Sequence, residues 1–183
     1  MLTNNFNLYK KIKKIRFYGI ETVDKKNKFF NKYFAREEGI NSRIDEIQAS
    51  ILNFKLKKVD KWISRRRQIA NIYFKNLKST SLTLPKLNKF SYHVYHLFTV
   101  YHPRRDKIIN ELKKKMIETR IIYEYPIHEM TAYKKLFFKK NHLKNSERKS
   151  KGIFCLPLYP EITNKEVLKV CKILKEIMKK LRL

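Results

Sequence analysis

The sequence predicts an α/β fold for residues 81–183, preceded by one long helix that lies within residues 39–80. Three observations support this prediction. No glycine or proline occurs between Gly39 and Pro85, so nothing in this stretch interrupts a helix. Beyond Pro85 the apolar pattern changes from helical to strand-like spacing, and a capped amphipathic helix closes the sequence. The expected order of elements in residues 81–183 is β-α-β-β-α.

The long helix is predicted to begin at a capping box formed by Ser42 and Asp45. Downstream, a set of mainly apolar residues recurs in alternating steps of four and three residues. They are Leu52, Leu56, Val59, Ile63, Arg66, Ala70, Tyr73 and Leu77. A single helix of about 35 residues would be roughly 50 Å long. A small domain cannot bury such a helix from end to end, so we expect it to connect domains or subunits.

Shorter elements flank the long helix. Apolar residues at helical spacing within residues 6–17 predict a short amphipathic helix that ends at Gly19, and residues 20–38 predict a loop. Residues 92–101 are rich in aromatic and β-branched side chains, which favour a strand. The remaining predicted elements are a helix at residues 105–115, strands at residues 119–123 and 152–156, and a terminal helix that starts with the capping box Thr163 to Glu166.

The composition predicts a folded protein. Hydrophobic residues make up 43% of the 183 residues, and the net charge is +28, from 44 Lys and Arg against 16 Asp and Glu. The lysines are spread along the whole chain together with many Asn, Ile, Phe and Tyr, whose codons are rich in A and T. A genomic composition bias therefore explains the charge better than a nucleic-acid-binding surface does, although that surface remains an alternative.

Several chemical classes are excluded or disfavoured. The three glycines stand alone, so there is no glycine-rich phosphate loop, and neither a nucleophile elbow nor a zinc-protease motif is present. His93 and His96 would point to opposite faces of a strand, so we expect no metal site. Cys155 and Cys171 lie in apolar runs and are expected to be buried, reduced thiols. No signal peptide or membrane span is expected, and we predict a cytoplasmic protein.

One segment resembles a known family signature. Residues 39–49, GINSRIDEIQA, are similar to the G-x-N-S-R-x-D-E-x-Q-A motif of the DegT/DnrJ/StrS family of nucleotide-sugar aminotransferases, which depend on pyridoxal 5'-phosphate (PLP). Further segments resemble family landmarks in the same order, so that the resemblance covers essentially the whole chain. They are residues 3–5, 16–19, 55–56, 66–73, 92–95, 105–106, 125–128 and 156–160.

The resemblance implies a fold-type I aminotransferase that is dimeric and moves an amino group onto a keto-sugar nucleotide, in surface polysaccharide or deoxyamino-sugar biosynthesis. Residues 81–183 would form its small C-terminal domain, residues 39–80 the connecting helix, and residues 1–38 an edge of the large domain. In the family, the lysine that binds PLP as a Schiff base lies in the large domain, upstream of the segment that this chain matches. We therefore expect no catalytic residue here and no activity of this chain alone.

The partner implied is a second copy of the chain or a separate large-domain polypeptide, with a nucleotide sugar as substrate. Alternatives are a non-catalytic assembly or binding fragment, a remnant of a decaying gene, or a basic nucleic-acid-binding protein.

Four residues are candidate site residues by this resemblance. Asn41 would reach across the dimer to the phosphate of the neighbouring subunit's PLP; judged by its chemistry alone, it could instead cap the helix. Arg43 would meet a phosphate or carboxylate, or be an ordinary first-turn arginine. Tyr123 and His128 would line the sugar-nucleotide site, or be structural. The family often has a histidine just before the Tyr-Pro of this loop, whereas this chain has Glu124 there.

Overall fold

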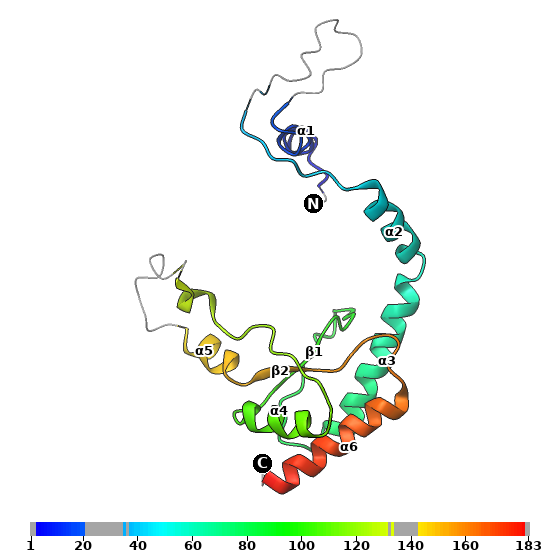
Figure 1. Ribbon diagram of the computed structural model, residues 1–183, viewed down its shortest axis with the longest axis vertical. Coiled ribbons are helices and arrows are strands. Elements are labelled where there is room, and N and C mark those ends of the chain that lie inside the picture. Colours follow the sequence, from blue (N-terminus) through cyan, green and yellow to red (C-terminus); the bar gives the residue numbers. More distant parts are fainter. Residues whose placement is uncertain (1–2, 21–34, 36, 132, 134–142, 182–183) are drawn as a thin grey trace, which may run out of the picture. The chain divides into compact units, whose positions relative to one another are not determined.

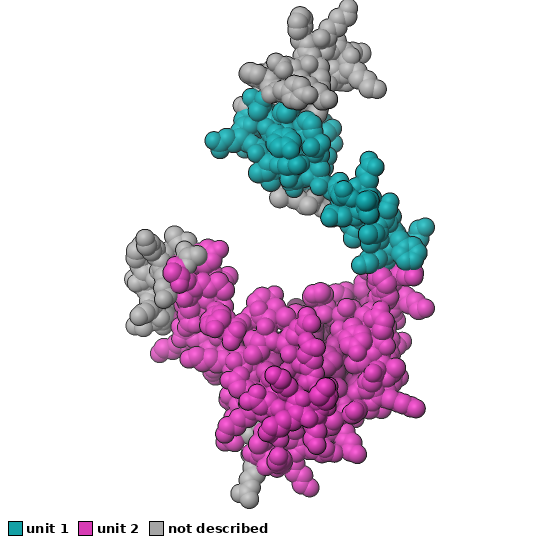
Figure 2. Space-filling model, in the orientation of Figure 1, with its two compact units in different colours: residues 1–57 teal, residues 58–183 magenta. Residues whose placement is uncertain are grey.

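The computed structural model describes residues 3–20, 35, 37–131, 133 and 143–181. The chain divides into two compact units, residues 1–57 and residues 58–183 (Figure 2). The division falls inside the stretch predicted as one connecting helix. We describe each unit by itself.

The first unit begins with helix α1, Phe6–Ile15, which confirms the predicted amphipathic helix (Figure 1). The side chain of Asn5 caps it by accepting a 3.0 Å hydrogen bond from the amide of Leu8. The predicted loop at residues 20–38 lies almost entirely outside the described residues.

Two backbone segments of the first unit approach each other closely after α1. Gly19 has a φ of 71°, and a Cβ atom there would overlap the carbonyl oxygen of Glu37. A Cβ at Gly39 would overlap the backbone of Tyr18 and Gly19. An antiparallel bridge then pairs Phe17 with Asn41. Glycine at both positions lets the signature segment run directly beside the end of α1.

Helix α2, Glu46–Leu56, begins later than the sequence predicted. Its N-cap is Asp45, whose carboxylate accepts hydrogen bonds from the amides of Ile47, at 2.8 Å, and Gln48, at 3.3 Å. Ser42 is not the cap, because its own amide donates a 3.0 Å hydrogen bond to the carbonyl of Arg16 and holds the segment extended. The ionised Asp45 is the stronger acceptor and also suits the positive end of the helix.

The prediction of one uninterrupted helix is wrong. α2 ends at Leu56, and helix α3, Val59–Leu77, begins after a turn at residues 57–58. The charge pattern gives a physical reason, although no glycine or proline is present. Lys55 in the last turn of α2 stabilises a helix C-terminus, and Asp60 in the first turn of α3 stabilises a helix N-terminus.

The second unit is built on a two-stranded antiparallel sheet (Figure 1). Strand β1, Phe98–Tyr101, pairs with β2, Ile153–Leu156, in a register that places Phe98 opposite Leu156. Isolated bridges extend the sheet on both sides, from Thr83 to Tyr101 and from Arg120 to Cys155. The strand predicted at residues 119–123 is therefore reduced to a single bridge.

The strand predicted at residues 92–101 is also shorter than expected, because Tyr95 leaves the extended region with a φ of 48°. A side chain of α3 holds this bend: Nη1 of Arg66 donates hydrogen bonds to the carbonyls of Tyr95, at 3.2 Å, and His96, at 3.0 Å. His93 and His96 consequently lie before β1 and not on a strand, which corrects the argument from opposite strand faces.

Helices complete the unit. They are α3, α4 (Arg105–Lys114), α5 (Lys144–Ser150) and α6 (Asn164–Leu181), together with the 3₁₀ helix η1 (Ile127–Glu129). Helices α3 and α4 both pack against α6. The capping box predicted for α6 is confirmed, since Glu166 accepts from the amide of Thr163 at 2.8 Å and the amide of Glu166 donates to the Thr163 hydroxyl at 3.3 Å.

The hydrophobic core lies where α3, α4 and α6 meet the two strands. Fully buried side chains from all five elements form it, namely Ile69, Tyr73, Leu77, Phe98, Val100, Ile108, Leu112, Phe154, Val167 and Leu174. Both cysteines are free thiols in buried positions, as the sequence predicted. Among the described residues, no helix is long and apolar enough to cross a membrane.

Candidate functional site

The signature segment places two donor side chains together in the first unit. Nε of Arg43 donates a 3.3 Å hydrogen bond to Oδ1 of Asn41, and both residues are exposed. The Arg43 guanidinium also lies over the rings of Phe17, with its carbon 4.7 Å from the ring centroid, and Tyr18, at 5.9 Å. The bridge between Phe17 and Asn41 brings these aromatic rings to the signature segment.

Asn41 does not occupy the position expected from the sequence. The sequence placed it at the start of a helix, but α2 starts at Glu46 with Asp45 as its cap. Asn41 therefore neither caps the helix nor lies in its first turn. Its Oδ1 accepts from Arg43, which orients the amide so that its NH₂ group remains a donor for a ligand. Together the amide and guanidinium form an exposed donor pair of the kind that binds phosphate or carboxylate groups.

The other two predicted site residues lie in the second unit. Tyr123 is exposed in the loop that follows the Arg120 bridge. His128 lies on η1, where its Nε2 is 3.1 Å from Oε1 of Glu147, a residue of α5. The structure thus brings Asn41 and Arg43 together, and it places Tyr123 and His128 on one loop of a different unit.

Three potential metal ligands meet at this loop, where the sequence predicted none. One ligand atom each from His128, Glu129 and Glu147 lies within 4.8 Å of the other two. A histidine and two carboxylates are a donor set that Zn²⁺ accepts. The sequence could not reveal the group, because Glu147 is separated from His128 by 19 residues. His128 and Glu147 are already in contact with each other through Nε2 and Oε1, at 3.1 Å.

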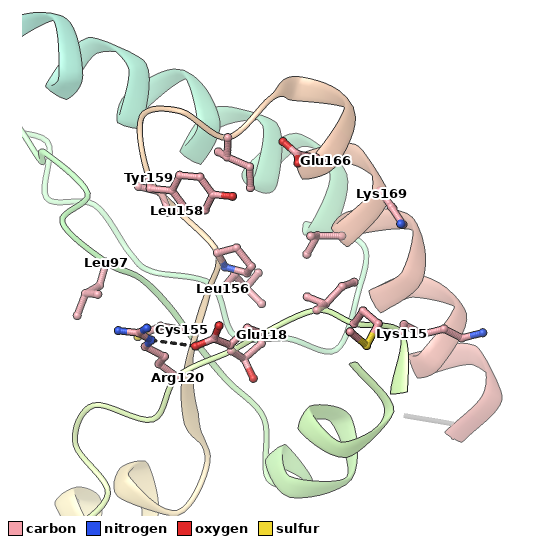
Figure 3. Close-up of a pocket in the computed structure, with 16 residues that line it drawn as sticks. Leu97, Lys115, Glu118, Arg120, Cys155, Leu156, Leu158, Tyr159, Glu166 and Lys169 are labelled. Atoms are coloured by element: carbon pink, nitrogen blue, oxygen red, sulfur yellow. Dashed lines mark hydrogen bonds and ion pairs between the residues drawn. The ribbon is translucent and has the colours of Figure 1, made fainter. Parts of the chain in front are cut away.

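A cavity of about 590 Å³ in the second unit was also not predicted (Figure 3). It is lined by Leu97, by residues 115–120, by residues 155–159, by Ile162 and by the first turns of α6. Arg120 and Glu118 form a 3.3 Å ion pair on its wall, and Lys169 contributes a further cation. Lys115 and Glu166 are also part of the lining, so the wall combines charged and apolar side chains. The Thr119 hydroxyl, which belongs to this lining, is buried without a hydrogen-bond partner among the described residues.

The fold and the signature segment together are typical of the small domain of sugar aminotransferases. The DegT/DnrJ/EryC1/StrS aminotransferase family matches residues 1–175, and the chain belongs to this family.

Similar proteins include the dTDP-3-amino-3,4,6-trideoxy-alpha-D-glucose transaminase of Micromonospora megalomicea subsp. nigra. It is 33% identical over 183 residues, which cover 97% of this chain and 47% of the relative. The GDP-perosamine synthase of Escherichia coli O157:H7 is 33% identical over 141 residues, which cover 75% of this chain and 37% of that protein. The chain thus spans about half the length of the curated relatives that it matches.

Solved structures confirm the fold. The structure of S. venezuelae DesV in complex with a ketimine intermediate matches with a TM-score of 0.85 and 29% identity, covering 96% of this chain and 45% of that one. The structure of NtdA from Bacillus subtilis, with bound cofactor PMP, matches with a TM-score of 0.79 and 26% identity, covering 97% of this chain and 41% of that one. The prediction of an α/β fold that corresponds to the small domain of a PLP aminotransferase is therefore confirmed.

Proposed function

We propose that this chain is the C-terminal part of a PLP-dependent aminotransferase that acts on a keto-sugar nucleotide. It would supply the small domain and a phosphate-binding segment, while a large domain supplies the lysine that binds the cofactor. The observation that carries the proposal is the Asn41–Arg43 donor pair within the family signature. The names of the relatives support a nucleotide-sugar substrate.

The residues of the signature segment fit the phosphate of PLP. When it is bound, the cofactor supplies an electron sink for the reacting amino group. The part of this chain would be limited to holding the phosphate, through the amide NH₂ of Asn41 and the guanidinium of Arg43. The guanidinium is a cationic donor and the amide is a neutral donor, and both residues are exposed. In the described structure no acidic side chain makes a hydrogen bond to either group.

The proposed substrate contacts are made by Tyr123 and His128. Tyr123 offers an exposed hydroxyl, and His128 offers an imidazole whose Nε2 is in contact with Glu147. Such groups form hydrogen bonds to the hydroxyls and phosphates of a nucleotide sugar. We assign them to substrate orientation and not to proton transfer.

The first unit offers a surface for the partner that the proposal requires. Five apolar side chains of α2 are about half exposed or more, although α2 belongs to a folded unit. They are Ile47 at 72%, Ile51 at 49%, Leu52 at 54%, Phe54 at 60% and Leu56 at 68%. A helix with this much exposed apolar surface is normally covered by another domain or subunit. We propose that the large domain or a second copy of the chain covers it. A non-catalytic assembly function would use the same surface.

A trapping experiment tests the proposal that the large domain, and not this chain, supplies the lysine that binds PLP. The 183-residue chain is incubated with PLP, reduced with borohydride and digested, and the modified lysines are located by mass spectrometry. The proposal predicts scattered, substoichiometric labelling, because exposed lysines react without selectivity. Stoichiometric labelling of one lysine would show that the chain holds the cofactor covalently by itself, which would contradict the proposal.

A complementation experiment tests the function itself. The chain is mixed with the large domain of a family member, and transfer of the amino group from glutamate to a dTDP-linked keto sugar is measured. We expect activity only in the mixture. A matched sample in which the Asn41→Ala variant replaces the chain should bind PLP more weakly. Equal activity with and without the chain would refute the proposed role.

A further inference from the structure

The loop that carries His128 is tied to the core of the second unit through α5. The carboxylate of Glu147, on α5, lies 3.1 Å from Nε2 of His128, and their side chains are 32% and 13% exposed. A carboxylate oxygen accepts hydrogen bonds, so the contact is a hydrogen bond in the tautomer whose Nε2 carries the proton. A hydrogen bond to an ionised group, partly shielded from water, orients an imidazole ring more strongly than a neutral contact does.

α5 is anchored independently of the His128 loop. Nη1 of Arg105, a buried residue at the start of α4, donates a 2.7 Å hydrogen bond to the carbonyl of Ser150, the last residue of α5. The Ser150 hydroxyl in turn donates to the carbonyl of Glu147 at 2.9 Å. Two residues beyond Ser150, Gly152 accepts from the amide of His102, and β2 begins. Glu147 is therefore fixed from the core side.

His128, by contrast, lies on a single 3₁₀ turn, which is a weak local structure. The core thus holds α5 in place, and Glu147 on α5 in turn contacts the His128 ring. We infer that Glu147 is a positioning residue that holds the His128 imidazole in its orientation. Its importance for substrate binding rests on the proposed function, in which His128 contacts the nucleotide sugar.

The first test reads the contact directly, in the full 183-residue chain and without substrate. The side-chain N–H of a histidine gives a visible signal in ¹⁵N–¹H spectra only when a hydrogen bond slows its exchange with water. The chain has five histidines, so the His128→Ala variant assigns the signal. We expect a His128 Nε2–H signal in the wild type, its loss in Glu147→Ala, and its retention in Glu147→Gln, whose amide oxygen can still accept. Glu124→Ala, an exposed change in the same loop, is the matched control.

The second test measures KM and kcat for the nucleotide sugar in the enzyme completed with a large domain. Glu147→Ala and His128→Ala should each raise KM about five- to tenfold with little effect on kcat, and the double variant should show no further rise, as residues that act as one unit do. Glu147→Gln should restore most of the affinity.

The two tests separate the positioning role of Glu147 from the proposed contact of His128 with substrate. A signal that is unchanged in Glu147→Ala overturns the positioning role whatever the kinetics show. A raised KM in His128→Ala alone, with Glu147→Ala like the wild type, overturns it as well. Loss of the signal with no change of KM in any variant leaves Glu147 as the residue that holds the ring, and refutes the proposed contact of His128 with substrate.

Discussion

The hydroxyl of Tyr73 donates a 2.7 Å hydrogen bond to the backbone carbonyl of Pro157. Tyr73 lies on the buried face of α3, and Pro157 directly follows β2. Burial raises the pKa of Tyr73 well above its ordinary value, so the hydroxyl remains protonated and a donor at neutral pH. This bond joins the helix to the segment that forms one wall of the cavity shown in Figure 3.

Tyr73→Phe removes this donor and leaves the Pro157 carbonyl without it. We expect a loss of about 1–2 kcal/mol in the free energy of unfolding, the usual cost when a hydrogen bond at a buried site loses one partner. Urea unfolding followed by the fluorescence of Trp62, the single tryptophan, measures it. Tyr125→Phe, at an exposed position, is the control and should leave stability unchanged. A loss of the same size in both variants would contradict our account.

Phe98 is predicted to make a large contribution to the stability of the second unit. Its ring is fully buried and packs against the rings of Tyr73, with centroids 4.9 Å apart, and Phe74, at 5.2 Å. Phe98→Ala should cost about 3–5 kcal/mol, because it leaves a cavity between α3 and β1. Phe90→Ala, where the side chain is 98% exposed, should have almost no effect in the same unfolding assay. A cost below about 1 kcal/mol for Phe98→Ala would show that the core does not depend on this ring.

The capping box of α6 predicts a specific acid dependence of stability. The pKa of Glu166 is lowered from its ordinary 4.5, first by the backbone amide of Thr163 and then by the hydroxyl of that residue. Because the folded-state pKa is the lower one, the carboxylate stabilises the folded state above about pH 4.5, and this contribution is lost as the pH falls through the folded-state value.

Glu166→Gln should therefore be less stable than the wild type at pH 6 and should approach it as the solution is acidified below pH 4. Thermal unfolding at a series of pH values measures this convergence. Glu161→Gln, at an exposed position before α6, provides the control for loss of one negative charge. A constant difference between wild type and Glu166→Gln across the series would exclude the capping carboxylate as its source.

Helices with local start signals could be predicted to within about two residues. α6 is an example, because Thr163 and Glu166 are three residues apart and their contacts are local. The failures have physical causes of two kinds. At the start of α2 the capping box of Ser42 and Asp45 did not form, because the amide of Ser42 donates a hydrogen bond to the distant Arg16 and Asp45 is the cap. At Tyr95, hydrogen bonds from Arg66 hold a bend in the backbone, although the residues of this segment favour a strand.

In the candidate site, too, local features could be predicted from the sequence and features that depend on distant packing could not. Asn41 and Arg43 are two residues apart in the family signature, so the sequence could propose both as neighbours in one segment, and they share a hydrogen bond. The partner of His128 could not be found, because Glu147 reaches it only through the packing of α5. The cavity beside β2 was missed for the same reason, since its walls come from stretches of the chain that are far apart in the sequence.

The contribution of Asn41 to cofactor binding can be isolated with a ligand that lacks the phosphate. In the enzyme completed with a large domain, Asn41→Ala should weaken PLP binding about tenfold, since a hydrogen bond to a charged group contributes about 1.5–3 kcal/mol when both partners are well placed. The same variant should bind pyridoxal, which has no phosphate, as well as the wild type does. Dissociation constants from absorbance titrations give both values. Asn53→Ala, on the exposed surface of α2, is the matched control and should change neither. Equal weakening for PLP and pyridoxal would mean that Asn41 acts on the fold of the signature segment, through its contact with Arg43, and not on the phosphate.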